Sequence, residues 1–290
     1  MKELWNAIIE NKIRYLKLLR APIKPIDKII FQVLVFLTAM LVIPFAIFKK
    51  KTIKESIFII FPKLMPKDLL IEFQGVKFMA RRGKTDILIL NELSEPWMKR
   101  YFKPNKGDVV IDVGAHVGKY SLPAAKLVGG NGKVIAIEAH PENFKALQTN
   151  ILLNGFKNII ALNIAAFNQD NKKLSLSGSR DSEFSLKSNL GENCVEVETR
   201  KIDSILQELG IETVNWVKID VEGAEVEVLQ GMEKVIACSQ NLKMLVEVGK
   251  ENSMKVNEIL RKFKRKILWE GNNFVVFYWR NRDKSQEEIT

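Results

Sequence analysis

Short apolar runs and amphipathic stretches alternate along the chain from about residue 106 onward. The runs that predict core strands are 108–113 (DVVIDV), 134–138 (VIAIE), 159–163 (IIALN), 215–220 (NWVKID) and 243–248 (KMLVEV). Helices are expected between them, such as one that begins at Pro141 and ends before Gly155. Strands that are apolar along their length and separated by helices imply a parallel sheet covered on both faces. We therefore expect an α/β fold.

Two other stretches of this half have strand patterns of a different kind. A polar segment after the third strand contains the alternating runs KLSLS and VEVET, which predict short strands. The chain then ends in KILWE and FVVFYW around the turn GNN, which predicts a hairpin. This hairpin would add an antiparallel edge strand to the sheet.

The front of the chain has a different pattern. Residues 1–28 have the spacing of a basic amphipathic helix, and the run from Ile29 to Phe48 has no charge. At about 1.5 Å per residue this run can cross a hydrocarbon core of about 30 Å. A straight span, an in-plane segment bent at Pro44 and a buried core helix all remain open. We expect a hydrophobic, membrane-associated segment over 29–65, a connecting region over 66–103 and a cytoplasmic catalytic domain over 104–290.

The charge is located in the same front segment. The whole chain has 45 Lys and Arg against 34 Asp and Glu, a net of +11. Residues 1–100 hold 19 of the basic and 9 of the acidic residues, a net of +10, which leaves 26 against 25, or +1, for the rest. We expect an anionic membrane surface as a partner and no nucleic acid, because aromatic residues are not interleaved with these charges. Cys194 and Cys238 form no CxxC pair, which favours a reducing, intracellular context.

Polar residues follow the expected strands, where an open α/β sheet binds its ligands. They are Asp112 with the loop GAHVG, Glu138, Asn163, Asp220 and Glu247. The loop is not a phosphate-binding P-loop, because it has one residue too few between its glycines and Tyr120 after its lysine. A glycine pair after a strand is as typical of a tight turn as of a ligand loop. Glu138, placed to accept two hydrogen bonds from a ribose, favours the ligand loop.

Six segments in this order resemble the FkbM family of methyltransferases. They are VVIDVGAHVGKYSLPAA, VIAIEAHPENFKALQTNILLNG, NIAAF, TRKIDSIL, WVKIDVEGAEVEVLQG and LVEVG, spread over roughly residues 104–280. The resemblance implies a Rossmann-like class I methyltransferase fold, with a mostly parallel seven-stranded sheet, and S-adenosyl-L-methionine as the cofactor. The residues it implies at the cofactor are Asp112, Gly114, Ala115 and Gly118 along the methionine part, Glu138 and Ala139 at the ribose, and Asn163 and Ala165 near the adenine.

Methyl transfer from a sulfonium needs an aligned acceptor and, for a hydroxyl acceptor, a base that removes its proton. The candidate catalytic residues are Asp220, Glu222 and His116, with His140 and Glu247 as weaker candidates. Asp220, Glu222 and Glu247 could instead hold Mg²⁺, although no ligand motif supports a metal. Glu225 and Glu227, which follow in KIDVEGAEVE, are expected to be helix-dipole partners on the solvated surface. Lys218 is expected to be a paired structural residue.

Members of the family often act on hydroxyl groups of sugars or polyketides. The resemblance therefore implies O-methylation of a hydroxyl-bearing acceptor, which we expect to be a glycan or glycolipid near a membrane. The NPPY or DPPY signature of nitrogen methylation is absent after the fourth strand, where KIDVEG stands. Methylation of protein or RNA, and an inactive membrane-tethered scaffold, remain the alternatives.

Overall fold

The computed structural model describes residues 62–63, 65, 67–90, 101–178, 194–249 and 251–263, with the strand backbones of 265–270 and 274–279. Both the expected amphipathic helix of residues 1–28 and the apolar run Ile29 to Phe48 lie outside the described residues. Within the described ranges, no helix has the length and apolar character needed to cross a membrane. The chain divides into two compact units. One comprises Met1–Tyr101 with Gln148–Gly155, and the other comprises Phe102–Leu147 with Phe156–Thr290.

The first unit contains a β-hairpin and a short helix. Strands β1 (Leu69–Phe73) and β2 (Val76–Ala80) pair in antiparallel register, with α4 (Asp86–Ile89) after them. The side chains of Asn150 and Asn154 lie in the part of α7 that belongs to this unit. Both accept hydrogen bonds from the backbone of β2, at Met79 N (2.8 Å) and Lys77 N (2.9 Å). These amides occupy an edge of β2 that could otherwise pair with another strand.

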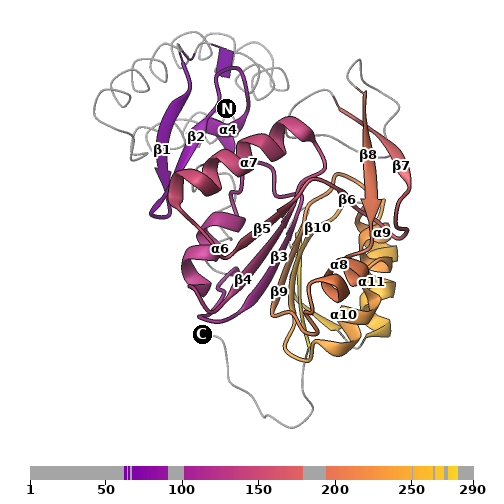
Figure 1. Ribbon diagram of the computed structural model, residues 1–290. Helices are drawn as coiled ribbons and strands as arrows, with labels where there is room; N and C mark the ends of the chain where they lie inside the picture. Colours follow the sequence, from indigo (N-terminus) through magenta and orange to yellow (C-terminus); the bar gives the residue numbers. More distant parts are fainter. Residues whose placement is uncertain are drawn as a thin grey trace, which may run out of the picture. The chain divides into compact units, whose positions relative to one another are not determined.

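The second unit is built on a central sheet with five parallel strands, in the order β10-β9-β3-β4-β5 (Figure 1). Their bounds are β3 Val109–Val113, β4 Lys133–Ile137, β5 Ile159–Leu162, β9 Trp216–Ile219 and β10 Lys243–Glu247. The expected Rossmann-like parallel sheet is thus confirmed. Strand β12 (Phe274–Trp279) pairs antiparallel with β10, and β11 (Arg265–Glu270) pairs antiparallel with β12. The strand antiparallel to the rest therefore lies between β10 and β11, and not at the edge.

Helices cover this sheet on two sides. Helix α6 (Ser121–Val128) contacts β3, β4 and β5, and the chain continues from β4 into α7 (Pro141–Asn154). The other face packs against a second group of helices, whose bounds are α8 Ile202–Glu208, α9 Glu225–Gln230, α10 Glu233–Cys238 and α11 Ser253–Lys262. Apolar side chains of alternate strand residues, such as Ile111, Ile135 and Val217, form the core on that side. The α6 face is different, because it also buries Asp112 and Lys218.

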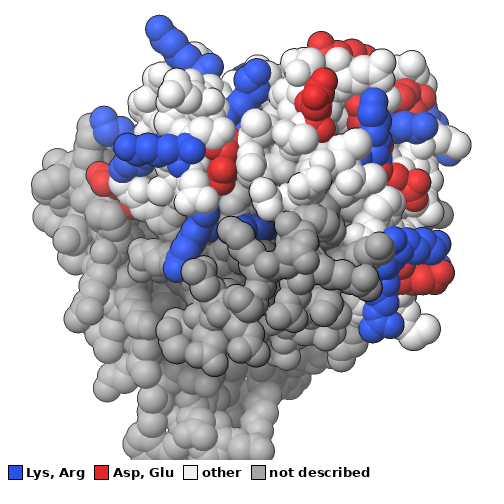
Figure 2. All heavy atoms as spheres, turned by 90° about the horizontal axis from the view of Figure 1, so that it is seen from below, with Lys and Arg blue, Asp and Glu red and all other residues white. Residues whose placement is uncertain are grey.

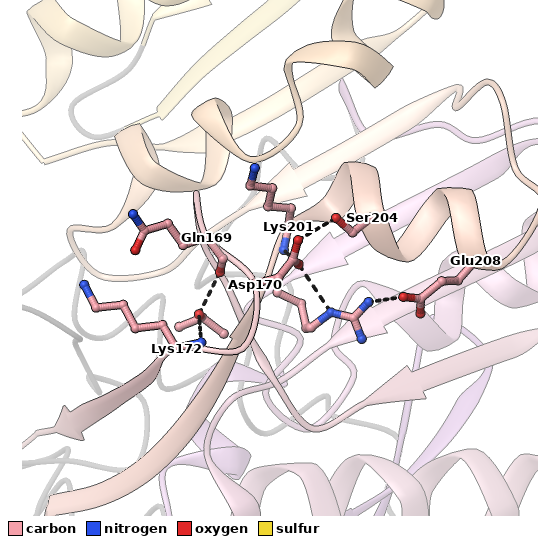
Figure 3. Close-up of polar contacts among 8 residues, drawn as sticks. Gln169, Asp170, Lys172, Lys201, Ser204 and Glu208 are labelled. Carbon is pink, nitrogen blue, oxygen red and sulfur yellow. Dashed lines mark hydrogen bonds and ion pairs between the residues drawn. The ribbon is translucent and has the colours of Figure 1, made fainter.

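A small sheet in the order β6-β8-β7 stands beside the central one in the second unit. It consists of β6 (Ala165–Ala166), β7 (Lys173–Ser177) and β8 (Cys194–Arg200), so both short strands expected in the polar segment are present. The loop between β6 and β7 is tied to the end of β8 and the start of α8 by Asp170 (Figure 3).

Candidate active site at the carboxyl ends of β3, β4 and β9

The order of the strands reverses between β3 and β9, because the chain first builds the sheet toward β5 and later toward β10. The carboxyl ends of these two strands touch. The N–H of Asp220 donates to the carbonyl of Val113 at 3.0 Å. A Cβ on Gly114 would lie 1.8 Å from the carbonyl oxygen of Asp220, so a side chain cannot be accommodated there. The glycine loop and the turn after β9 therefore meet at the point where α/β folds of this type bind ligands.

The loop Gly114–Gly118 is held at both ends. The N–H groups of Gly114 and Ala115 donate to the carbonyl of Ile137 at 2.9 and 3.0 Å, which ties the loop to the end of β4. Gly118 has φ +94°, and a Cβ there would lie 2.1 Å from Cδ1 of Leu122. Both glycines are thus required by close packing as well as by their backbone angles.

Glu138 follows β4 directly and is buried. Its two carboxylate oxygens accept hydrogen bonds from the backbone N–H groups of His116 (2.7 Å) and His140 (2.8 Å). Burial raises the pKa of Glu138 to about 7, although these two hydrogen bonds oppose the shift. Each oxygen of a carboxylate can accept more than one hydrogen bond. The side chain is therefore fixed in place and still fits two donors such as the hydroxyls of a ribose.

Asn163 and Ala165, the residues expected near the adenine, have different surroundings. Asn163 is exposed after β5, and its Nδ2 donates to the carbonyls of Glu138 (2.8 Å) and Ala139 (3.0 Å), which fixes the chain that leaves β4. The methyl group of Ala165 is buried in a small cluster with Leu176 and Val197. Contact between Ala165 and a ligand would therefore involve its backbone.

Asp112 and Lys218 lie opposite each other on β3 and β9, and both are buried. Lys218 Nζ donates to Asp220 Oδ2 at 3.0 Å and to the carbonyl of Gly114 at 3.3 Å, and lies 3.9 Å from Asp112 Oδ1. Burial raises the pKa of Asp112, while the ammonium of Lys218 and a hydrogen bond from Ser121 Oγ (2.5 Å) oppose that shift. Asp112 has no exposed surface, and its partners are Ser121 and Lys218. The expected structural lysine thus links the loop to a candidate catalytic carboxylate.

The three candidate catalytic residues lie on the loops that follow β3 and β9. The side chain of Asp220 is 28% exposed and is paired with Lys218. Glu222 is exposed and His116 is half-buried, and both have a left-handed backbone, with φ of +49° and +51°. Non-glycine residues rarely adopt this conformation, and they often do so at functional sites. Among the described residues, no group of three or more His, Cys, Asp and Glu side chains could hold a metal ion.

Glu225 differs from the expectation for it. It begins α9 but is only 2% exposed, so its assignment to the solvated surface is wrong. Its carboxylate accepts hydrogen bonds from the N–H of Gly223 and from Nδ2 of Asn252, both at 2.6 Å. Sequence reasoning did not find Asn252, because no local pattern marks a contact between residues so far apart in the chain.

Residues 112–270 match the family model of the Methyltransferase FkbM domain. The match covers more than half of the 290 residues. The chain therefore belongs to the FkbM family of S-adenosylmethionine-dependent methyltransferases. The geometry fits this cofactor, because the buried carboxylate of Glu138, which can accept a diol, stands beside the glycine loop at the carboxyl ends of β3 and β4.

One sequence relative is a tRNA(Phe) (4-demethylwyosine(37)-C(7)) aminocarboxypropyltransferase from Pyrococcus horikoshii. It is 36% identical over 98 residues, which make up 34% of this chain and 32% of that protein, so the chain matches about a third of the relative's length. The expectation of a glycan or glycolipid acceptor with no nucleic-acid partner is overturned by this relative, which acts on tRNA. Basic charge without interleaved aromatic residues was too weak a sign to exclude nucleic acid.

Two solved structures are similar to the chain in fold. A transferase from Pyrococcus horikoshii has a TM-score of 0.44 and 18% identity, and the similarity covers 73% of this chain and 70% of that one. A precorrin-6y C5,15-methyltransferase from Geobacter metallireducens has a TM-score of 0.43 and 12% identity, with 66% and 89% covered.

Proposed function

We propose that this chain transfers the methyl group of S-adenosyl-L-methionine to an RNA acceptor. The relative that acts on tRNA(Phe) is the observation that carries the choice of acceptor. The net charge of +11 supports it, since a basic chain attracts a polyanion. On the face that Figure 2 shows, the described Lys and Arg side chains lie among Asp and Glu side chains. Residues 101–290 have a net charge of only +1. We therefore assign the attraction to residues 1–100, which carry the surplus.

The roles of the residues follow from their places. The sulfonium of the cofactor supplies an already activated methyl group, and the protein must hold it and orient the acceptor. Glu138 accepts the ribose hydroxyls, and the loop Gly114–Gly118, tied to Glu138 by the N–H of His116, contacts the rest of the cofactor. The side chain of Asp220 is held by Lys218 Nζ at 3.0 Å, whereas Glu222 is exposed on the turn that follows β9. We assign Glu222 as the first candidate to accept the acceptor's proton, and Asp220 to orient it.

The proposal is tested with cofactor labelled in two positions. Full-length protein is incubated with total RNA and S-adenosyl-L-methionine labelled either in the methyl group or in the carboxyl group, because either alkyl group can leave a sulfonium. We expect methyl label in the RNA, sensitive to ribonuclease, resistant to protease and weakened by rising salt. Label that enters only protein, lipid or glycan fractions would exclude RNA as the acceptor. Transfer of carboxyl label would show that the group transferred is aminocarboxypropyl.

Substitution of the two carboxylates tests their assignment. Glu222→Gln should lower turnover by about 10²–10⁴-fold, with the affinity for the cofactor little changed. Asp220→Asn should lower turnover less, because it orients and does not accept the proton. Glu233→Gln, at an exposed position on α10, is the matched control and should leave turnover unchanged. Normal turnover in Glu222→Gln would remove it from the reaction.

A further inference from the structure

The turn after β9 has an unusual backbone. Glu222 has φ +49° and Gly223 has φ +105°, so two consecutive residues are left-handed. A glycine adopts such angles readily, but a glutamate rarely does. The first residue of the turn, Asp220, is fixed by its N–H bond to Val113, whereas Glu222 is exposed. The backbone groups of the next residue, Gly223, are held by side chains from beyond the turn.

Glu225 and Asn252 are the side chains that bind Gly223. Glu225 Oε1 accepts the N–H of Gly223 at 2.6 Å, and Asn252 Nδ2 donates to the carbonyl of Gly223 at 3.0 Å. The same Nδ2 donates to Glu225 Oε2 at 2.6 Å, which closes a ring of three hydrogen bonds. Both backbone groups of Gly223 are thus bound, and the two side chains that bind them are 2% and 7% exposed. We name this arrangement the Glu225–Asn252 clasp.

The side chain of Asn252 binds the turn after β9 and does not cap its own helix. Asn252 is the N-cap of α11, where an asparagine side chain usually accepts an N–H of its own helix. Here it makes no such capping hydrogen bond, and its amide is directed to the turn. The clasp also joins the chain that follows β10 to the turn that follows β9, and α11 contacts α9.

We propose that Glu225 and Asn252 are positioning residues, which hold the turn after β9 so that Glu222 stays in place for the reaction. This inference rests on the proposed function. Loss of the clasp should let Gly223 leave its left-handed conformation and move Glu222, while Glu138 and the glycine loop, which carry the cofactor, keep all their own hydrogen bonds. If the clasp only stabilised the fold, its loss would lower turnover no more than another substitution that destabilises the protein equally.

The test compares Asn252→Ala with Asn215→Ala in the full chain. Asn215 Oδ1 accepts the N–H of Val109 at 2.8 Å, at the opposite end of β9 from the turn, so its loss is a matched structural control. For each variant we would measure the melting temperature, the affinity for S-adenosyl-L-methionine and the methyl transfer to total RNA. Asn252→Ala should lose at least about tenfold in turnover, with cofactor affinity within about twofold of the wild type, and Asn215→Ala should keep its turnover. Equal losses in the two variants would overturn the inference.

A second pair of variants tests the chemistry of the clasp. Asn252→Asp places a carboxylate against Glu225 and should be more harmful than Asn252→Ala. Adding Glu225→Gln restores a donor and an acceptor between the two side chains, so the double variant should recover part of the turnover. Absence of recovery would contradict the direct coupling of the two residues.

Hydrogen exchange separates this inference from the proposed function. The amide of Gly223 should exchange at least about tenfold faster in Asn252→Ala than in the wild type, and at an unchanged rate in Asn215→Ala. An unchanged rate in Asn252→Ala would overturn the clasp whatever the reaction is. A wild-type chain that transfers no methyl group to RNA would instead overturn the proposed function, and the exchange rate would still decide the clasp.

Discussion

The chemical properties of single residues at this site depend on their surroundings. Glu138 follows β4 directly, and its burial raises its pKa to about 7, against an ordinary value of 4.5. A group with a raised pKa contributes stability that is present below its unfolded pKa and is lost as the pH rises through the folded one. Near neutral pH the buried carboxylate of Glu138 therefore destabilises the folded chain when no cofactor is bound. Donors from a ribose would offset that cost, because they favour the charged form.

This coupling predicts that binding of S-adenosyl-L-methionine depends on pH. The affinity should be up to about tenfold weaker at pH 6 than at pH 8, because the proton on Glu138 must leave before the carboxylate accepts two hydroxyls. Calorimetry in buffers with different ionisation enthalpies would detect the released proton near pH 7. Glu138→Gln should bind more weakly and lose this dependence. Affinity that is the same at both pH values in the wild type would show that Glu138 does not bind the ribose as an anion.

At the scale of elements, distant loops are joined by side chains that replace local capping. Lys201 is the N-cap residue of α8, but its side chain makes no capping hydrogen bond. The side chain of Asp170 accepts hydrogen bonds at the start of this helix instead (Figure 3). Its carboxylate accepts the N–H of Lys201 and the hydroxyl of Ser204, both at 2.7 Å, and pairs with Arg200. Burial alone would raise the pKa of Asp170, but these partners together lower it. Arg200 also pairs with Glu208 at the other end of α8.

Asp170→Asn should destabilise the second unit by about 1–2 kcal/mol, because it removes the ion pair and one acceptor at the start of α8. Chemical denaturation would measure the loss at neutral pH. A lowered pKa means that this stabilisation is present above the unfolded value of 3.8 and is lost as the pH falls through the lower folded value. The difference between variant and wild type should therefore shrink in acid. Glu196→Gln, at the exposed pair with Lys173, is the control and should change stability by less than about 1 kcal/mol.

The whole molecule joins a catalytic fold of nearly balanced charge to a basic, apolar front segment. Residues 101–290 have a net charge of +1, and residues 1–100 have a net charge of +10 and contain the run Ile29 to Phe48. The family match begins at residue 112, so it gives no information about this segment. We propose that the run attaches the chain to a membrane, since its length suits the hydrocarbon core.

Membrane attachment predicts that the full chain sediments with membranes and resists carbonate extraction. Leu37→Arg places a charge near the middle of the run, at a cost of about 2.5–3.5 kcal/mol in a spanning helix, and should release much of the protein. Leu127→Arg, at an exposed position on α6, controls for the added charge. A wild-type chain that stays in solution without detergent would contradict the proposed localisation.

Much of the fold and part of the site follow from local patterns in the sequence. Apolar runs of strand length predicted the five parallel strands, because a strand buried on both faces must be apolar along its whole length. The glycine loop and Glu138 were found at the ends of β3 and β4, because the strand pattern alone locates these ends. The expectation of a glycan or glycolipid acceptor and no nucleic acid was wrong, since neither the strand pattern nor the net charge specifies which acceptor a site binds.

The tertiary structure alone decided which polar side chains meet. Lys218 reaches Gly114 and Asp112, Asp170 reaches Lys201, and Asn252 reaches Gly223, and each pair joins segments that lie well apart in the chain. Such pairs depend on which strands become neighbours in the sheet and on where the loops beyond them end. Burial then sets their strength, because a polar group removed from water must find its partner within the protein. The sequence alone therefore determined the strands and the positions of their ends, while the neighbours brought together by folding determined how Glu138, Lys218 and Glu225 act there.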